Sequence, residues 1–267
     1  MERARQIPLV LEPIVSETLA QLNRDQSQVT SADLLHRCAT LAPARSLAAA
    51  LQQKTLALIA EFKPRSPSRG LLRADADPRV FAQAYRPAAA ISVLCDRRFF
   101  GGGPELLAAF RALTDQPLLA KGFFVDPYQL AQVRALGADA ALLIARLLPG
   151  DHLAAMVAES RQLGLEVLVE THTEREIAQA LACGVRIIGV NARDLDTLQI
   201  DLARARELLA LLPADRIRVA ESGIEDLGEL ELLRQMHRRG QADAVLMGTA
   251  FMTAADPQKT VAALGFL

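Results

Sequence analysis

The sequence predicts an α/β protein built as a (β/α)8 TIM barrel with an N-terminal helical extension. Apolar runs rich in β-favouring residues alternate with stretches of helical periodicity. The eight runs are LALIAEF (56–62), AAISVLC (89–95), PLLAKGF (117–123), AALLIA (140–145), EVLVE (166–170), IIGVNA (187–192), IRVAESG (217–223) and AVLMGTA (244–250). Apolar strands separated by helices are typical of a parallel sheet covered on both faces. Eight such units in about 210 residues match this barrel in size.

The segments between and before these runs read as helices. Three of them stop at a glycine that fits a C-cap: Gly137, Gly184 and Gly240. Before the first run, SETLAQLN and SADLLHRCATL each open at a serine suited to an N-cap. We therefore expect residues 1–55 to form a helical extension packed on the barrel rim, residues 56–267 to form the barrel, and the whole to be a single structural domain.

A doubly wound open sheet is the alternative fold. It is disfavoured because no glycine-rich dinucleotide fingerprint follows the first run. The stretch FFGGGPE (99–105) is rich in glycine but has neither Rossmann nor Walker spacing. We interpret it as a βα loop.

The composition excludes several classes of protein. Apolar residues make up 51% of the chain, charged residues 23%, and the formal net charge is −1, so nothing indicates a nucleic-acid or membrane partner. No stretch approaches the roughly 20 apolar residues of a membrane span, and no signal peptide is evident. Three cysteines far apart (Cys38, Cys95 and Cys183) fit a reducing cytosol, which predicts a cytoplasmic protein. Neither they nor the histidines have metal-ligand spacing.

Charged and polar side chains stand at the C-terminal ends of the predicted strands, where such barrels place their active sites. They are Glu61, Lys63, Lys121, Glu170, Asn191, Arg193 and Glu221. Side chains alternate along a strand, so Glu61 and Lys63 share a face. Each residue alone has a structural explanation, such as capping the next helix. Two lysines and three glutamates at one rim together predict proton-transfer chemistry near neutral pH.

The last two strands end in small residues. ESGIED follows the seventh and GTAFM follows the eighth, which offers Ser222, Gly223, Gly248 and Thr249. Barrels often bind phosphate at this position, through backbone N–H groups and a short helix. Glycine at a βα turn also occurs without any ligand, but we favour a phosphate site.

With these motifs in place, the chain resembles the indole-3-glycerol-phosphate synthases of tryptophan biosynthesis over nearly its whole length. The stretches that carry the resemblance are IAEFKPRSPSRG, SVLCDRRFFGGG, KGFFVDPYQL, GADAALLI, LVETHTERE, VNARDL and AESGI. It implies a carboxy-lyase acting on 1-(o-carboxyphenylamino)-1-deoxyribulose 5-phosphate. The reaction releases carbon dioxide and water, forms an indole ring, and uses no metal or organic cofactor.

The resemblance also implies roles for individual residues. Lys121 would be the general acid for ring closure, Glu170 and Lys63 would transfer protons during dehydration, and Glu61 would tune Lys63. The residues that would orient the substrate are Asn191, Arg193, Glu221 and Ser222, with Phe100 and Phe123 against its aromatic ring. Those that would hold its phosphate are Ser66, Gly223, Gly248 and Thr249. The SPSRG loop would be a mobile lid.

The chain departs from the family pattern at several positions, one of them directly after Lys121. Gly122 stands where the family has aspartate, Cys95 where it has threonine, and Ala192 where it has asparagine or serine. Two other functions therefore stay open: a diverged paralogue acting on a related arylamino-sugar phosphate, and a non-catalytic barrel that binds a phosphorylated ligand. The expected partner is the phosphorylated small molecule, and other tryptophan-pathway enzymes stay open as partners.

Overall fold

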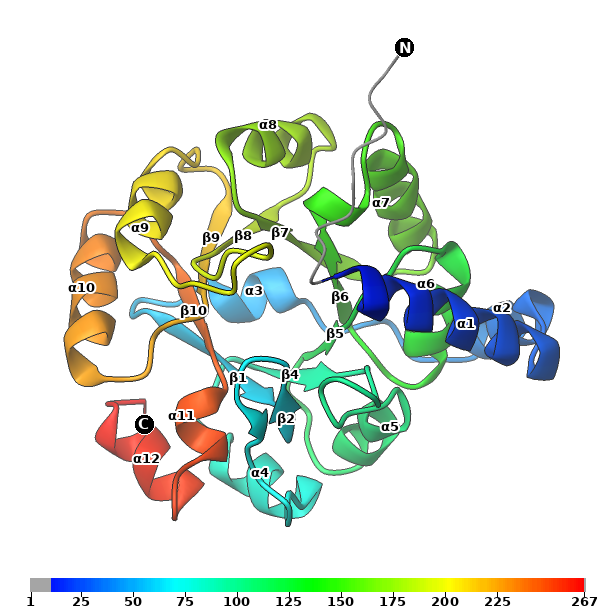
Figure 1. The fold of residues 1–267 in the computed structure, drawn as a ribbon, viewed down its shortest axis with the longest axis horizontal. Helices are drawn as coiled ribbons and strands as arrows, with labels where there is room; N and C mark the ends of the chain where they lie inside the picture. Colours follow the sequence, from blue (N-terminus) through cyan, green and yellow to red (C-terminus); the bar gives the residue numbers. More distant parts are fainter. Residues whose placement is uncertain (1–10, 267) are drawn as a thin grey trace.

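The computed structural model describes residues 11–266 of the chain, and these residues form a closed barrel of eight parallel strands (Figure 1). The strands, in their order around the barrel, are β1 (Ala57–Phe62), β10 (Ala244–Met247), β9 (Ile217–Glu221), β8 (Ile187–Asn191), β7 (Glu166–Thr171), β6 (Ala140–Ile144), β5 (Leu118–Lys121) and β4 (Ala90–Leu94). Each of them falls within a predicted run, except that β7 continues one residue further, to Thr171. The predicted fold class is confirmed.

Helices surround the barrel, and those that precede β10 connect successive strands (Figure 1). They are α4 (Pro78–Ala84), α5 (Glu105–Arg111), α6 (Pro127–Ala135), η1 (Ala145–Leu147), α7 (His152–Gln162), α8 (Glu174–Ala182), α9 (Leu202–Ala210), α10 (Leu227–Arg238), α11 (Thr249–Met252) and α12 (Pro257–Ala263). Gly137, Gly184 and Gly240 lie just beyond α6, α8 and α10 with positive φ, as the sequence predicted for these helix ends. A two-stranded hairpin, β2 (Arg65–Ser66) with β3 (Gly70–Leu71), was not predicted; it lies in the SPSRG loop.

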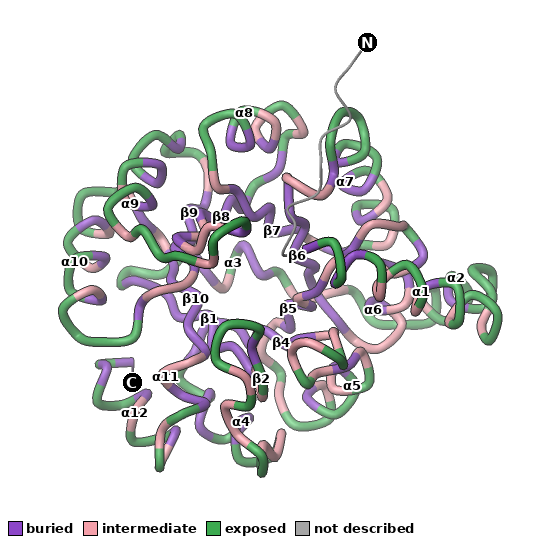
Figure 2. Tube along the Cα trace, viewed as in Figure 1, coloured by how far each residue is buried: buried purple, intermediate pink, exposed green. Residues whose placement is uncertain are grey.

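Alternation along each strand divides the apolar residues between two cores. In β1, Ile59 belongs to the cluster inside the barrel, whereas Leu58 and Ala60 belong to the cluster between the strands and the helices. Figure 2 shows the strands buried and the outer faces of the helices exposed. The polar residues at the strand ends therefore point inward when they continue the inner series.

The N-terminal segment contains α1 (Glu12–Gln28), α2 (Ser31–Ala39) and α3 (Leu47–Leu51). The predicted serine caps were wrong. Helix α1 starts before Ser16, and Thr30 caps α2 because its side chain and that of Asp33 form a reciprocal capping box. Ser31 is already the first helical residue.

This segment reaches both ends of the barrel. At one end, Ile14 of α1 belongs to the cluster inside the barrel and lines the cavity at the strand C-termini. At the other end, Leu47 and Leu51 of α3 belong to the same inner cluster and are buried. Figure 1 shows α3 across the middle of the barrel. The extension thus does more than cover the rim, because α3 also closes the barrel at the strand N-termini.

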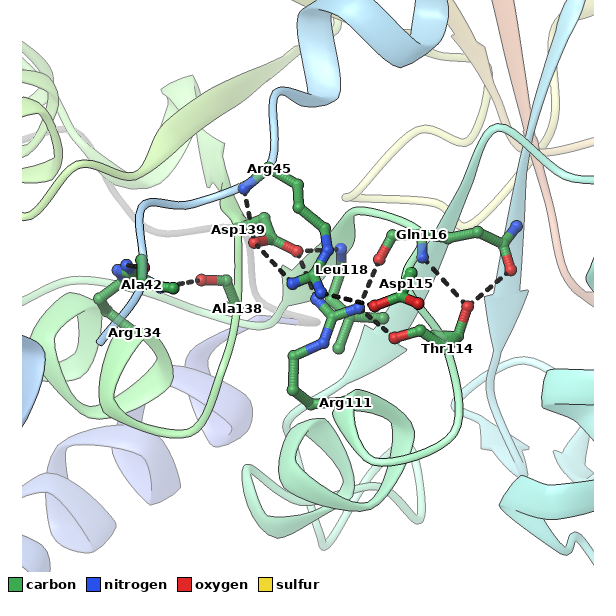
Figure 3. Close-up of polar contacts among 10 residues, drawn as sticks. All are labelled: Ala42, Arg45, Arg111, Thr114, Asp115, Gln116, Leu118, Arg134, Ala138 and Asp139. Atoms are coloured by element: carbon green, nitrogen blue, oxygen red, sulfur yellow. Dashed lines mark hydrogen bonds and ion pairs between the residues drawn. The ribbon is translucent and has the colours of Figure 1, made fainter. Parts of the chain in front are cut away.

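The buried carboxylate of Asp139 fixes the linker between α2 and α3 to the barrel (Figure 3). The Oδ1 atom of Asp139 accepts a hydrogen bond from the backbone N–H of Arg45 at 2.8 Å. Its Oδ2 atom accepts from Arg111 Nη1 at 2.6 Å and from the backbone N–H of Leu118 at 2.9 Å. Glu166 binds Ser46 and Ala48 in the same way. These contacts hold the linker to the start of β5, β6 and β7. Among residues 11–266, no helix is long and apolar enough to cross a membrane.

Candidate active site

A cavity opens at the C-terminal ends of the strands, and nearly all predicted site residues line it. Those that line it are Glu61, Lys63, Ser66, Phe100, Lys121, Phe123, Glu170, Asn191, Arg193, Ser222, Gly223, Gly248 and Thr249. Glu221 is not among the lining residues, and its expected contact with the substrate stays a prediction. It lies below the cavity surface, 1% exposed, and touches Lys121.

Glu61 joins the two predicted catalytic lysines. Its Oε1 atom lies 2.6 Å from Lys63 Nζ, and its Oε2 atom lies 3.2 Å from Lys121 Nζ. Lys121 Nζ also donates to Glu221 Oε2 at 3.2 Å. The pairing of Glu61 with Lys63 agrees with the sequence analysis, but its contact with Lys121 was not foreseen. Both ammonium groups are thus held by carboxylates at the base of the cavity.

Two glycines make room for these carboxylates. A Cβ atom on Gly248 would lie 2.7 Å from Glu61 Oε1, and one on Gly189 would lie 2.0 Å from Glu221 Oε1. Real Cβ contacts are not that short, so any side chain at either position would displace a carboxylate. Gly189 was not singled out from the sequence, because a glycine inside a strand also fits a bulge.

The charge network shifts the pKa values of its members. Burial alone would raise the pKa of Glu61, but the ammonium groups of Lys121 and Lys63 outweigh it and hold that pKa at about 2. Burial would lower the pKa of Lys121, yet Glu61, Glu221 and Glu170 raise it well above its usual range. At neutral pH Glu61 is therefore an anion and Lys121 a cation.

Glu221 behaves in the opposite way. Burial raises its pKa to about 8, Glu170 adds to the effect, and the attraction of Lys121 only partly offsets it. Its Oε1 atom is buried and has no hydrogen-bond partner. Among these glutamates, Glu221 is the one that environment favours in its protonated form near neutral pH.

Asn191 and Arg193 form the next side of the cavity. The backbone N–H of Arg193 donates to Asn191 Oδ1 at 2.9 Å, and Arg193 Nη1 donates to the Leu198 carbonyl at 3.0 Å. Burial lowers the pKa of Arg193, and the nearby Arg69 guanidinium lowers it further. A partly desolvated guanidinium is suited to a carboxylate or phosphate ligand.

The loops after β9 and β10 offer backbone groups to an anion. Ser222 and Gly223 have φ values of 65° and 79°. A left-handed serine costs energy and is common at ligand-binding sites. Gly248 precedes α11, and the N-terminus of this helix has no side-chain cap. Thr249 is the first residue of that short helix.

The cavity also has an apolar wall. The rings of Phe100 and Phe123 lie 5.9 Å apart between centroids and are tilted by 39°. Leu142, Ile144 and Leu195 extend the wall, together with Ile14 of α1. The sequence analysis did not name these aliphatic residues, because they look like ordinary core positions.

Comparison with known proteins identifies the family. The family model "Indole-3-glycerol phosphate synthase" matches residues 11–264. The chain is 43% identical to indole-3-glycerol phosphate synthase 2 of Streptomyces coelicolor over 257 residues, which cover 96% of the chain and 98% of that protein. The chain belongs to the indole-3-glycerol phosphate synthase family.

Other relatives carry the same name. The indole-3-glycerol phosphate synthase of Roseiflexus sp. is 41% identical, over 96% of this chain and 98% of its own. The indole-3-glycerol phosphate synthase of Rhodopirellula baltica is 40% identical, over 97% of this chain and 98% of its own. The family match runs from α1 to α12, so the N-terminal helices and the barrel both belong to it. The resemblance stated from the motifs is confirmed.

Within this synthase-family site, two charged side chains bridge the loops at the cavity mouth. Arg69 Nη2, in the loop after β1, lies 2.8 Å from Glu225 Oε1, in the loop after β9. Both residues line the cavity. The SPSRG loop was expected to be a lid, and this pair connects it to the loop after β9, a strand separated from β1 by β10 alone. The sequence analysis named Ser66 and Gly223, which lie near Arg69 and Glu225, but no sequence pattern indicated that the two loops meet.

Gly122, the main departure from the family pattern, lies between two cavities. It lines the active-site cavity and a second one between α1 and the loops after β4 and β5. A Cβ atom on Gly122 would lie 3.4 Å from Phe124 and 3.6 Å from Cys95, which are ordinary contacts. The side chain of residue 122 would thus point away from Lys121, as alternation predicted. Within residues 11–266, no group of acidic, histidine or cysteine side chains could hold a metal ion.

Proposed function

We propose that this member of the indole-3-glycerol phosphate synthase family catalyses the decarboxylating ring closure and dehydration of 1-(o-carboxyphenylamino)-1-deoxyribulose 5-phosphate to indole-3-glycerol phosphate. The observation that carries the proposal is the Lys121 ammonium, which is held between Glu61 and Glu221 at the base of the cavity. The same cavity is lined by apolar residues, including Phe100 and Phe123, and by the loops after β9 and β10, which we propose bind the phosphate. This arrangement fits a substrate with an aromatic ring at one end and a phosphate at the other.

Lys121 is assigned to ring closure. When the aromatic carbon attacks the substrate ketone, negative charge develops on the ketone oxygen. An ammonium held by the Glu61 carboxylate and the Glu221 carboxyl group can donate a hydrogen bond to that oxygen without reorganising, and it can then protonate it. Its raised pKa favours the cation at neutral pH, so the group is ready before the substrate arrives.

Glu170 and Lys63 are assigned to the dehydration that follows. Both line the cavity, and they come from different strands. The ammonium of Lys63, paired with Glu61 at 2.6 Å, is the proposed acid that protonates the leaving hydroxyl. The Glu170 carboxylate is the proposed base that removes the ring proton. The electrons of that C–H bond then complete the indole, and water leaves.

The remaining residues are proposed to orient the substrate. Arg193 and Asn191 would hold its carboxylate until carbon dioxide leaves, and Ser222 would contact the same molecule. Ser66, Gly223, Gly248 and Thr249 would surround the phosphate, while Phe100 and Phe123 would contact the ring. Glu221 acts through Lys121 in this scheme, because it lies beneath the cavity surface.

A diverged paralogue is the second candidate, and Gly122 is the observation that favours it. Gly122 lines both the active-site cavity and the second cavity, and it has no side chain where the family has aspartate, so we propose that this position accommodates a different aryl group. We also propose the cytoplasm as the compartment, because Cys38, Cys95 and Cys183 are all free thiols. Other enzymes of tryptophan synthesis remain proposed partners.

The test is direct. Purified protein is mixed with 1-(o-carboxyphenylamino)-1-deoxyribulose 5-phosphate, and indole fluorescence and carbon dioxide are followed together. The proposal expects one carbon dioxide per indole formed, and loss of both products in the Lys121→Met variant. Binding of the substrate without turnover would favour a non-catalytic barrel. Turnover only of a substituted aryl analogue would favour the paralogue.

A further inference from the structure

A buried histidine next to Glu170 has no part in the scheme above. His172 follows β7 two residues after Glu170, and its side chain is 4% exposed. Its Nε2 atom lies 3.5 Å from Glu170 Oε1, and its Nδ1 atom lies 3.5 Å from Glu176 Oε2. Neither ring nitrogen has a hydrogen-bond partner at normal length. The imidazole is therefore placed between two carboxylates without being locked to either.

The carboxylate on the far side of His172 is firmly held. Glu176 Oε2 accepts a hydrogen bond from the backbone N–H of His172 at 2.6 Å, and Glu176 Oε1 lies 3.1 Å from Arg146 Nε. Arg146 Nη1 also contacts Asp196 Oδ2 at 3.1 Å. Burial would raise the pKa of Glu176, but His172 and Arg146 hold it at about 2. Glu176 is thus a fixed anion, and it faces one ring nitrogen of His172.

The other charged groups near this row belong to the active site. Glu170 faces Nε2 from β7, and its charge raises the pKa values of Lys121 of β5 and Glu221 of β9. A ring with a carboxylate oxygen at each nitrogen can donate to both only as the imidazolium. Catalytic hydrogen bonds are often long without substrate and shorten in the complex. A distance of 3.5 Å leaves His172 free to close on Glu170 during the reaction.

We propose that His172 is a positioning residue for Glu170: held by Glu176 from behind, it orients the Glu170 carboxylate toward the substrate and supplies positive charge beside it. The inference rests on the proposed role of Glu170 in dehydration. It implies a chain of polar contacts that runs from the surface residue Asp196 to the cavity, through Arg146, Glu176 and His172.

Two substitutions separate positioning from simple packing. The amide nitrogen of glutamine can occupy the place of Nε2, facing Glu170, whereas that of asparagine can occupy only the place of Nδ1, facing Glu176. His172→Gln should keep kcat within a few-fold of the wild type. His172→Asn should lower kcat about 10- to 100-fold with little change in KM, since a misplaced catalytic group costs about that much. Glu174→Gln, an exposed change in the first turn of α8, is the control and should change nothing.

The pH profile of kcat provides the second measurement. Both variants put a neutral amide where the proposal places positive charge, so the acidic limb should move to higher pH in both. If His172 only filled space in the packing, its replacement would not shift the acidic limb. If asparagine performs as well as glutamine, or if neither variant moves the limb, the proposal is overturned. If His172→Asn fails to fold, the acidic limb of the His172→Gln pH profile alone tests the proposal. A wild type that forms no indole would instead refute the proposed function.

Discussion

The Oε2 atom of Glu61 lies 3.2 Å from the Nζ atom of Lys121, although their strands, β1 and β5, are separated in the barrel by β4. The same carboxylate also binds Lys63 at 2.6 Å. One anion therefore sets the positions of the proposed acid for ring closure and the proposed acid for dehydration. Space for this anion depends on Gly248, which comes from a third strand end.

The first prediction concerns this shared anion. Glu61→Gln should lower kcat by about 10²-fold or more, because both ammonium groups lose the charge that positions them. The exposed Glu207→Gln, which removes only a surface partner of Arg204, should leave kcat unchanged. Steady-state kinetics of both variants measure the difference. A Glu61→Gln enzyme within three-fold of the wild type would contradict the shared role.

Glu61 also predicts a difference in acid stability. Its folded-state pKa of about 2 lies below the unfolded value of about 4.5, so its contribution is complete above pH 4.5 and disappears as the pH falls toward 2. The wild-type Tm should thus fall more steeply over this window than that of Glu61→Gln. Calorimetry at half-unit intervals measures it, and parallel curves would show that the paired carboxylate adds no pH-dependent stability.

A second prediction tests the assignment of Lys121. Lys121→Arg keeps the positive charge, but a planar guanidinium replaces the compact ammonium that lies 3.2 Å from both Glu61 and Glu221, so the donor no longer stands where the ketone oxygen needs it. We expect kcat to fall roughly 10²- to 10⁴-fold, the usual cost of losing a positioned general acid. KM should change much less, since other residues hold the phosphate and carboxylate. Near-normal turnover would remove Lys121 from its proposed role.

The barrel could be predicted from the sequence because its signals are local. Each strand is an uninterrupted apolar run, and the strand ends converge by topology, so Lys63, Lys121 and Glu170 could be placed at one rim. Helix starts were less certain, because several residues near Thr30 could cap α2. Only the three-dimensional geometry shows which one does.

Other parts of the site depend on contacts between distant segments, which the pattern does not contain. The depth of Glu221 depends on Gly189 in the neighbouring strand. His172 looks like a loop residue, and its burial between two carboxylates depends on how α8 packs. The bridge from Arg69 to Glu225 likewise joins loops more than 150 positions apart in number. The position of a residue at a strand end predicts that it lies at the same rim as the others. It does not predict how deeply the side chain is buried or which side chains it contacts.

The third prediction concerns Gly248, which makes room for the Glu61 carboxylate and is also proposed to contact the phosphate. Kinetics of variants can separate these two roles. Its Cβ in a Gly248→Ala variant would lie 2.7 Å from Glu61 Oε1 and would displace that carboxylate. We expect kcat to fall about 10-fold or more, with the larger effect on kcat than on KM. Thr249→Ala should show the reverse, a raised KM with kcat nearly kept, if its hydroxyl contacts phosphate. Gly228→Ala, in α10, is the control. An effect of Gly248→Ala on KM alone would support a purely phosphate-binding role.

The fourth prediction restores the family's aspartate. In Gly122→Asp the new Cβ makes only ordinary contacts with Phe124 and Cys95, so the fold should tolerate it. Activity on the standard substrate should stay the same or rise, since the carboxylate points toward the second cavity and could support the segment that carries Lys121. Turnover of the standard substrate and of bulkier aryl analogues is measured side by side. Loss of activity on the native substrate would show that the site has been reshaped around Gly122, and the paralogue would replace the synthase as the proposed function.

The last prediction addresses whether residues 1–55 and 56–267 form a single structural domain, as we propose. Leu51 of α3 is 1% exposed and packs inside the barrel at the strand N-termini, so Leu51→Ala should cost about 2–5 kcal/mol of unfolding free energy. Leu35→Ala, at a 48% exposed position on α2, should cost much less. Because α3 fills the end of the barrel and Asp139 and Glu166 hold its linker, the wild type and Leu51→Ala should each melt in one transition, at a lower Tm in the variant. Far-UV circular dichroism and hydrogen exchange of the barrel strands would follow it. A first transition confined to residues 1–55, with the strands still protected, would show instead that the extension folds independently.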